Sequence, residues 1–139
     1  MSKPLEILKQ YWKHTAFREP QEAIIQSVLA GNDTFTLMPT GGGKSICFQV
    51  PGMMMEGICL VISPLIALMK DQVQNLQSKG IKAIALTGGI HQDDIIDLLD
   101  NCQYGNYKFL YLSPERLQSD WILERLKNLP INLIAIDEA

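Results

Sequence analysis

Short apolar runs alternate along the chain with longer segments in which apolar residues recur at helical spacing. The runs predict five β-strands, over residues 34–38, 58–62, 83–86, 109–112 and 133–136. Several of them are apolar throughout, which is typical of strands covered on both faces of a parallel sheet. The helical spacing predicts helices over residues 20–30, 63–79, 91–102 and 120–129.

Alternation of strands and helices predicts an open, doubly wound α/β sheet with right-handed crossovers. Ligands bind such sheets at the carboxyl ends of the strands. The length of 139 residues, with 47% hydrophobic and 19% charged residues, is typical of one globular domain with a proper core. We find no internal repeat, low-complexity tract or linker.

The charge and the cysteine content indicate little about which ligands the protein binds and more about its compartment. The net charge of −3 gives no indication of nucleic-acid binding, although a local track can bind phosphates on an acidic protein. Cys47, Cys59 and Cys102 lack any CxxC spacing, which favours reduced thiols and no zinc site. The odd number of cysteines with no pairing pattern leads us to expect a cytoplasmic protein. No signal peptide and no apolar stretch of membrane-spanning length are found.

Residues 38–45 read Met-Pro-Thr-Gly-Gly-Gly-Lys-Ser and follow a predicted strand. Glycines allow a loop to wrap closely around a polyphosphate, and the helix that follows presents free amides to the anion. Lys44 can reach the β- and γ-phosphates, and Ser45 offers a hydroxyl to Mg²⁺. The alternative is a glycine-rich turn that only precedes a lysine, because Met38 stands where the strict pattern has glycine. The predicted triphosphate-binding residues are Thr40, Gly41, Gly42, Gly43, Lys44 and Ser45.

Two carboxylates, Asp137 and Glu138, follow the last predicted strand. In P-loop proteins an acid in this place helps to hold Mg²⁺, and a neighbouring acid can activate the attacking water. The alternative is a strand that simply meets solvent. The presence of Lys44 and Ser45 upstream favours the metal interpretation.

These motifs together resemble those of RecQ-type DNA helicases of superfamily 2, over nearly the whole chain. Residues 38–45 match motif I of that family, and residues 63–72 resemble motif Ia. Residues 111–116 match a later Ser-Pro-Glu-Arg motif, and residues 137–139 match the start of an Asp-Glu-Ala-His box. The resemblance implies a P-loop NTPase fold, a RecA-like doubly wound parallel sheet that forms a truncated first helicase domain.

Upstream residues resemble motif 0, the adenine-reading element of the family. Gln21 carries an amide that can both donate to and accept from the adenine edge. By resemblance Arg18 assists, and His14 takes the place of a ring that stacks on the base; its alternative is a surface helix residue. We therefore expect N-terminal helices with the adenine motif over residues 1–30, and the helicase ATP-binding domain over 31–139.

Two Ser-Pro turns each follow a strand and start a helix, so each offers free amides to a phosphate. By resemblance, they contact the backbone of single-stranded DNA with Lys70 and Arg116 as charged partners; helix capping is the alternative role. Thr87 belongs to a further candidate contact. The predicted DNA-binding residues are Ser63, Pro64, Lys70, Ser113 and Arg116.

The resemblance implies an ATP-dependent 3′–5′ DNA helicase that moves on single-stranded DNA and unwinds duplexes in recombination and repair. Lys44, Asp137 and Glu138 would be catalytic, Ser45 and Asp137 would bind Mg²⁺, and the protein would be a monomer in the bacterial cytoplasm. The chain stops at Ala139, so we expect a fragment without the arginine finger, whose loss slows hydrolysis ~10³–10⁵-fold. Two alternatives stay open: a binding module without catalysis, and an Asp-Glu-Ala-Asp box RNA helicase, against which motifs I and Ia argue.

Overall fold

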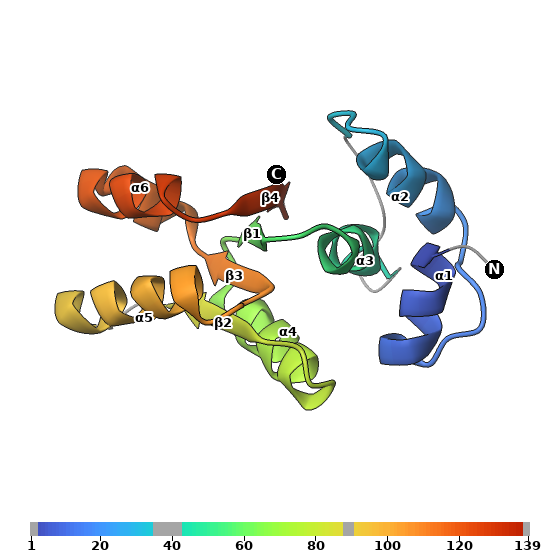
Figure 1. Cartoon of the computed structure of the whole chain (residues 1–139), viewed down its shortest axis with the longest axis horizontal. Helices are drawn as coiled ribbons and strands as arrows, with labels where there is room; N and C mark the ends of the chain where they lie inside the picture. The colour runs from blue at the N-terminus through green and yellow to red at the C-terminus, as the bar shows by residue number, and fades with distance from the viewer. Residues whose placement is uncertain (1–2, 35–42, 88–90, 138–139) are drawn as a thin grey trace. The chain divides into compact units, whose positions relative to one another are not determined.

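The computed structural model describes residues 3–34, 43–87 and 91–137 (Figure 1). These residues group into two compact units, Met1–Glu56 and Gly57–Ala139, which are described separately below. Nearly all of the predicted strand over 34–38 lies outside the described residues. The expected domain limit after residue 30 stays a prediction.

The first unit is helical. Its elements are helix α1 (Lys3–Ile7), a short π-helix η1 (Leu8–Trp12), α2 (Gln21–Leu29) and α3 (Ile46–Met54). Helix α3 packs against both α1 and α2, and Leu8, Ile25 and Val50 are buried at the centre of this small core. The helix predicted over residues 20–30 is confirmed, and the helix expected after the glycine loop is confirmed as α3.

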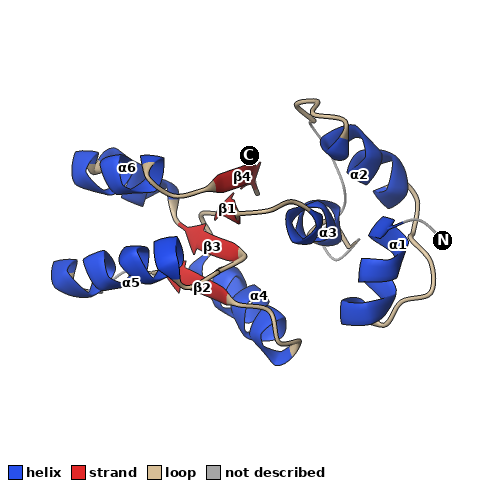
Figure 2. Ribbon diagram, in the orientation of Figure 1, coloured by secondary structure: helices blue, strands red, loops and turns tan. Residues whose placement is uncertain are grey.

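The second unit contains a sheet of four parallel strands in the order β2-β3-β1-β4 (Figure 2). The strands are β1 (Ile58–Ile62), β2 (Ala83–Leu86), β3 (Phe109–Leu112) and β4 (Ile131–Ile136). Three match the predicted bounds, and β4 begins two residues earlier because Ile131 pairs with Ile58. Strands β1 and β3 are buried throughout, as their uninterrupted apolar runs predicted.

Helices cover both faces of this sheet. The helical elements of the unit are α4 (Ile66–Ser78), α5 (Gln92–Tyr104), a 3-10 helix η2 (Pro114–Gln118) and α6 (Asp120–Lys127). Helices α5 and α6 pack on the face that carries Leu60 and Leu110. Helix α4 contacts β2 and β3, and its Gln72 meets Tyr111 on the opposite face. The predicted doubly wound parallel sheet is therefore confirmed.

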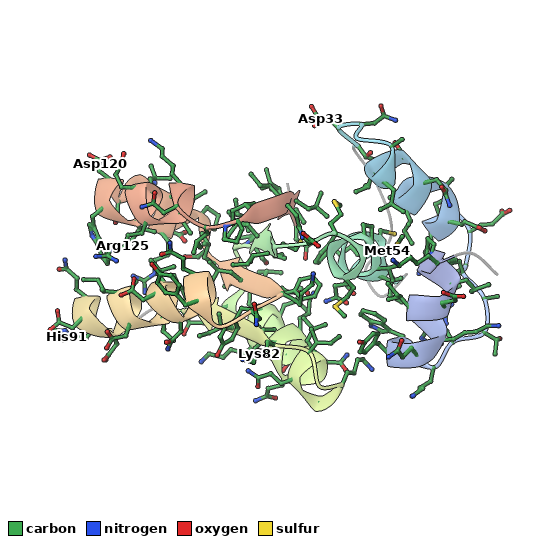
Figure 3. All side chains as sticks on the ribbon, in the orientation of Figure 1. Asp33, Met54, Lys82, His91, Asp120 and Arg125 are labelled. Atoms are coloured by element: carbon green, nitrogen blue, oxygen red, sulfur yellow. The ribbon has the colours of Figure 1, made fainter. Side chains whose placement is uncertain are left out.

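Helices α5 and α6 are also joined at their surface. Arg125 on α6 points toward α5 (Figure 3), and its guanidinium lies 3.2 Å from the carboxylate of Asp100. Both side chains are substantially exposed, and exposed ion pairs typically contribute less than about 1 kcal/mol. The apolar core between the helices and the sheet therefore holds this layer in place.

One predicted boundary is wrong. Helix α4 was expected to start at Ser63 with Pro64 in its first turn, but it starts at Ile66. The Ser63 amide donates to the carbonyl of Leu112 at 3.1 Å and so continues the strand pairing. The helix can begin only after the chain has left the sheet. Ser113 does precede a helix directly, with Pro114 in its first turn, and this helix is η2.

Candidate functional site

In the first unit, the end of the glycine loop leads directly into helix α3. Gly43 has a φ of 78°, in the left-handed region that favours glycine. The amides of Ile46 and Cys47 donate to the carbonyls of Gly43 and Lys44, so the first helical turn forms immediately after the loop. Thr40, Gly41 and Gly42 lie outside the described residues. The described part thus has the loop-to-helix geometry that an anion site requires.

Gln21 connects the predicted adenine motif to this loop. Its side chain is only 3% exposed, and its oxygen accepts a hydrogen bond of 2.8 Å from the Arg18 amide. Its side-chain nitrogen donates to the carbonyl of Gly43 at 3.0 Å. The structure therefore brings together two motifs that are 22 residues apart in the chain. Both ends of the Gln21 amide are occupied within the unit.

The other two adenine-motif residues lie at the surface. His14 and Arg18 are exposed, and both fall in the segment between η1 and α2. Lys13, just before His14, has a φ of 62° and ends the π-helix. His14 is therefore an exposed loop residue. The alternative of a surface helix residue is right about its exposure and wrong about the helix. Its role toward adenine stays a prediction.

In the second unit, four predicted site positions follow the four strands side by side. Leu86, Leu112, Ile62 and Ile136 are in register across the sheet. The next residues in the chain are Thr87, Ser113, Ser63 and Asp137. The Asp137 amide donates to the Ile62 carbonyl at 2.8 Å, which continues the pairing by one residue. Since parallel strands lie about 4.8 Å apart, these positions form a continuous row at the carboxyl edge.

The two serines of this row are buried. Ser63 is 2% exposed and its oxygen accepts a 3.3 Å hydrogen bond from the Leu65 amide, while Ser113 is 9% exposed. Pro64, which follows Ser63, is exposed. The roles of Ser63 and Ser113 toward DNA stay predictions.

The two predicted cations differ in their surroundings. Lys70 is exposed on helix α4. Arg116 is half-buried on η2 and donates a hydrogen bond to the main-chain carbonyl of Thr87. No sequence pattern predicts this bond, because it joins a side chain to a backbone atom 29 residues away.

The predicted metal ligands, Ser45 and Asp137, belong to different units, so their pairing stays a prediction. Ser45 lies half-exposed at the start of α3, and Asp137 lies half-buried at the end of β4. Hydroxyl and carboxylate oxygens are the donors that Mg²⁺ prefers, so the residue types fit the ion. Glu138 lies outside the described residues. Within the described parts of the chain, no group of three His, Cys, Asp or Glu is placed to hold a metal.

All three cysteines are buried. Burial raises the pKa of Cys59 to about 12, against a smaller opposing effect of the nearby Lys108, and raises that of Cys102 to about 11. Burial also raises the pKa of Cys47. These thiols stay protonated at neutral pH and pack as small apolar groups. Of the helices described, none is long and apolar enough to cross a membrane.

Comparison with known families and proteins shows what the chain as a whole is similar to. The DEAD/DEAH box helicase family matches residues 18–139. The chain is 48% identical over its whole length to a probable ATP-dependent DNA helicase RecS of Bacillus subtilis, and covers 28% of that protein. It is 43% identical to the ATP-dependent DNA helicase RecQ of the same organism, over 96% of the chain and 23% of that protein. The chain thus spans about a quarter of the length of these relatives.

Solved structures show the same fold at lower sequence identity. A crystal structure of the DUF1998 helicase MrfA bound to DNA and AMPPNP superposes with a TM-score of 0.78 at 20% identity, over 98% of this chain and 21% of that one. A hypothetical ATP-dependent RNA helicase from Sulfolobus tokodaii gives a TM-score of 0.70 at 20% identity, over 98% of this chain and 41% of that one. Together with the parallel sheet, these similarities confirm the expected RecA-like P-loop fold.

Proposed function

Since the chain belongs to the DEAD/DEAH box helicase family, we propose that it is the ATP-binding part of a RecQ-type, ATP-dependent DNA helicase. The hydrogen bond from Gln21 to Gly43 carries this proposal, because it joins the adenine motif to the phosphate loop within one unit. A site that recognises both ends of ATP needs these two elements side by side. The similarity to RecS and RecQ supports DNA as the nucleic acid.

The residues of the first unit would bind and orient the nucleotide. The turn that leads from the glycine loop into α3 would surround the phosphates, and Lys44 would add a positive charge beside them. Gln21, with Arg18 and His14 near it in the chain, would recognise adenine. The Gln21 amide would exchange at least one of its present partners for the base, since both of its ends are already engaged.

The carboxylates would act on the metal ion and on the attacking water. Ser45 and Asp137 would hold Mg²⁺, which neutralises phosphate charge when it is bound. Glu138 would orient the attacking water and accept its proton. Lys44, Asp137 and Glu138 are therefore the proposed catalytic residues.

DNA would bind along the carboxyl edge of the sheet in the second unit. The first turns of α4 and η2, which follow Ser63-Pro64 and Ser113, would offer main-chain amides, and Lys70 and Arg116 supply positive charge nearby. Contacts with the sugar-phosphate backbone carry no sequence information, which suits an enzyme that must move along any sequence. We further propose 3′–5′ movement on single strands, duplex unwinding in recombination and repair, and a monomer in the bacterial cytoplasm.

Substitution of the loop lysine tests the nucleotide site. We expect ATP with Mg²⁺ to raise the melting temperature of the wild type more than GTP does, because a ligand that binds only the folded state stabilises it by RT ln(1 + [L]/Kd). Lys44→Ala should remove most of the ATP effect. Lys3→Ala, an exposed lysine on α1, is the matched control and should keep it. Equal protection of the wild type and Lys44→Ala by ATP would refute a functional P-loop in this protein.

A further inference from the structure

The side chain of Arg116 bridges two neighbouring loops of the second unit. Arg116 lies on η2, just after β3, and its Nη2 atom donates to the main-chain carbonyl oxygen of Thr87 at 2.5 Å. Thr87 is the residue that follows β2. Strands β2 and β3 are neighbours, and their ladder ends with the pair Leu86 and Leu112. The arginine therefore joins the segments that follow β2 and β3, just beyond the last residue pair of their ladder.

The chemistry of this contact suits a fixed link. A hydrogen bond from a charged donor is shorter and stronger than one between neutral groups. The planar guanidinium also holds its donors in fixed directions, which a lysine ammonium does not. Arg116 is half-buried, and its own amide donates to the Ser113 carbonyl at 3.1 Å, so its backbone is anchored in the η2 turn.

Lys70 offers a useful contrast in the same unit. It is exposed on α4, near the Ser63 turn in sequence. Its ammonium group can turn toward a phosphate without giving up a hydrogen bond that the structure records. At least one donor of Arg116, in contrast, is directed at a protein carbonyl. The two cations of the proposed DNA edge are therefore not equivalent.

We propose that Arg116 is a positioning residue, which holds the Thr87 backbone beside the Ser113 turn so that this part of the edge is preformed for a DNA backbone. The inference rests on the proposed function, because it assigns Arg116 a role within the proposed DNA edge. When the loops of the edge are already ordered, binding of a DNA strand costs less free energy. Loss of Arg116 should thus weaken binding without removing a phosphate contact.

The dependence of DNA affinity on salt separates the two roles. Each phosphate neutralised on a single strand adds about 0.7 to the slope of log affinity against log salt. In the full-length protein, we expect Arg116→Met to lower the affinity for a labelled single strand about tenfold or more, with the slope unchanged. Lys70→Ala should lower the slope by about 0.7 if it contacts one phosphate. If the salt slope of Arg116→Met also fell by about 0.7, the positioning role would be overturned. An unchanged DNA affinity of Arg116→Met would overturn it as well.

Arg116→Lys provides a second variant that keeps the charge. Lysine binds phosphate well as a point charge but lacks the fork that fixes the carbonyl. A positioning role predicts that Arg116→Lys also loses affinity with the slope retained, whereas a direct phosphate role predicts wild-type affinity. Melting temperatures of all variants, measured alongside, should stay close to the wild type. If Arg116→Met does not fold, the affinity of Arg116→Lys decides between the positioning role and the direct phosphate role.

Hydrogen exchange without DNA keeps this inference separate from the proposed function. Amides in peptides that contain Thr87 should exchange faster in Arg116→Met and Arg116→Lys than in the wild type, and at the wild-type rate in Lys70→Ala. Unchanged exchange in both Arg116 variants would overturn the link. Failure of the wild type to bind single strands at any salt would instead refute the proposed DNA edge, whatever the exchange result.

Discussion

Gly43 combines a backbone constraint with a side-chain contact. Its φ of 78° is strained for any residue with a Cβ, and a Cβ placed there would lie 2.4 Å from the Gln21 side-chain nitrogen. Gly31 has a similar φ of 86°, but a Cβ placed on it would meet nothing within 4 Å. The two glycines therefore separate the effect of backbone strain from that of displacing Gln21.

We expect both Gly43→Ala and Gly31→Ala to destabilise the fold by about 1–2 kcal/mol, the usual cost of a left-handed conformation for alanine. Only Gly43→Ala should also lower ATP affinity, by about tenfold or more, because the Gln21 amide must move away from the loop. Urea unfolding and ATP titration measure the two effects. Similar ATP affinities for the two variants would show that the contact of Gln21 with Gly43 does not matter for binding.

Cys59 makes a testable contribution to the pH dependence of stability. Its folded pKa is about 12, above the ordinary value of 9.0, because burial disfavours the thiolate. In the unfolded chain the thiol loses its proton near pH 9, whereas in the folded protein it keeps it. The stability that this thiol contributes is therefore complete below pH 9 and is lost as the pH rises toward 12, by about 1.4 kcal/mol per pH unit.

Comparison of the wild type with Cys59→Ala isolates this effect, because tyrosines and lysines titrate in both proteins. Between pH 9 and pH 10.5, the free energy of unfolding of the wild type should fall by about 1–2 kcal/mol more than that of the variant. Urea unfolding at a series of pH values measures the difference. Parallel curves for the two proteins would mean that the Cys59 thiol ionises equally well when folded.

At the scale of elements, helix α4 is fixed to the sheet by a polar contact as well as by packing. The Tyr111 hydroxyl, on the buried strand β3, donates to the Gln72 side-chain oxygen at 2.7 Å. Met69, Val73 and Leu76 bury the apolar stripe of the same helix. The hydrogen bond therefore adds a directional contact to the apolar packing of this helix on the sheet.

We expect Tyr111→Phe and Gln72→Ala each to lower the free energy of unfolding by about 1 kcal/mol, the net value of a hydrogen bond of this kind. The double variant should lose less than the sum, because both changes remove the same bond. Gln74→Ala, an exposed glutamine on the same helix, is the control and should stay within about 0.5 kcal/mol of the wild type. Fully additive losses would argue against the bond.

At the scale of the whole molecule, the distribution of charge matters more than its total. The net charge of −3 would disfavour DNA, yet helices α4 and η2 both begin just after strands that end at the carboxyl edge of the sheet. Binding there should depend on phosphate contacts and not on base sequence. The proposed enzyme would thus bind DNA through a local edge on an acidic protein.

We expect single-stranded DNA of different sequences to bind with similar affinity, and each affinity to fall as salt is raised. For two to four phosphate contacts, the slope of about 0.7 per phosphate corresponds to a loss of about 7- to 50-fold between about 50 and about 200 mM salt. Titrations of labelled single strands at several salt concentrations measure this. A flat affinity would contradict the phosphate contacts, and tighter binding of RNA than of DNA would favour the RNA helicase alternative.

The sequence alone determined the fold class and most of the elements. The uninterrupted apolar runs at Ile58–Ile62 and Phe109–Leu112 predicted buried parallel strands, because only a strand covered on both faces needs apolar residues at every position. The motifs likewise identified the candidate site residues, since their chemistry depends on residue type and local spacing. The start of α4 was misjudged because Ser63 carries a capping side chain but lies in strand pairing, which local sequence does not reveal.

Only the tertiary structure decided which of these residues meet and which atoms they present. The order of the strands places Thr87, Ser113, Ser63 and Asp137 in one row, although the sequence separates them widely. It also buried Ser63 and Ser113 and engaged Arg116 with a backbone carbonyl. Bonds from a side chain to a distant backbone atom leave no pattern in the sequence, because every residue offers the same carbonyl.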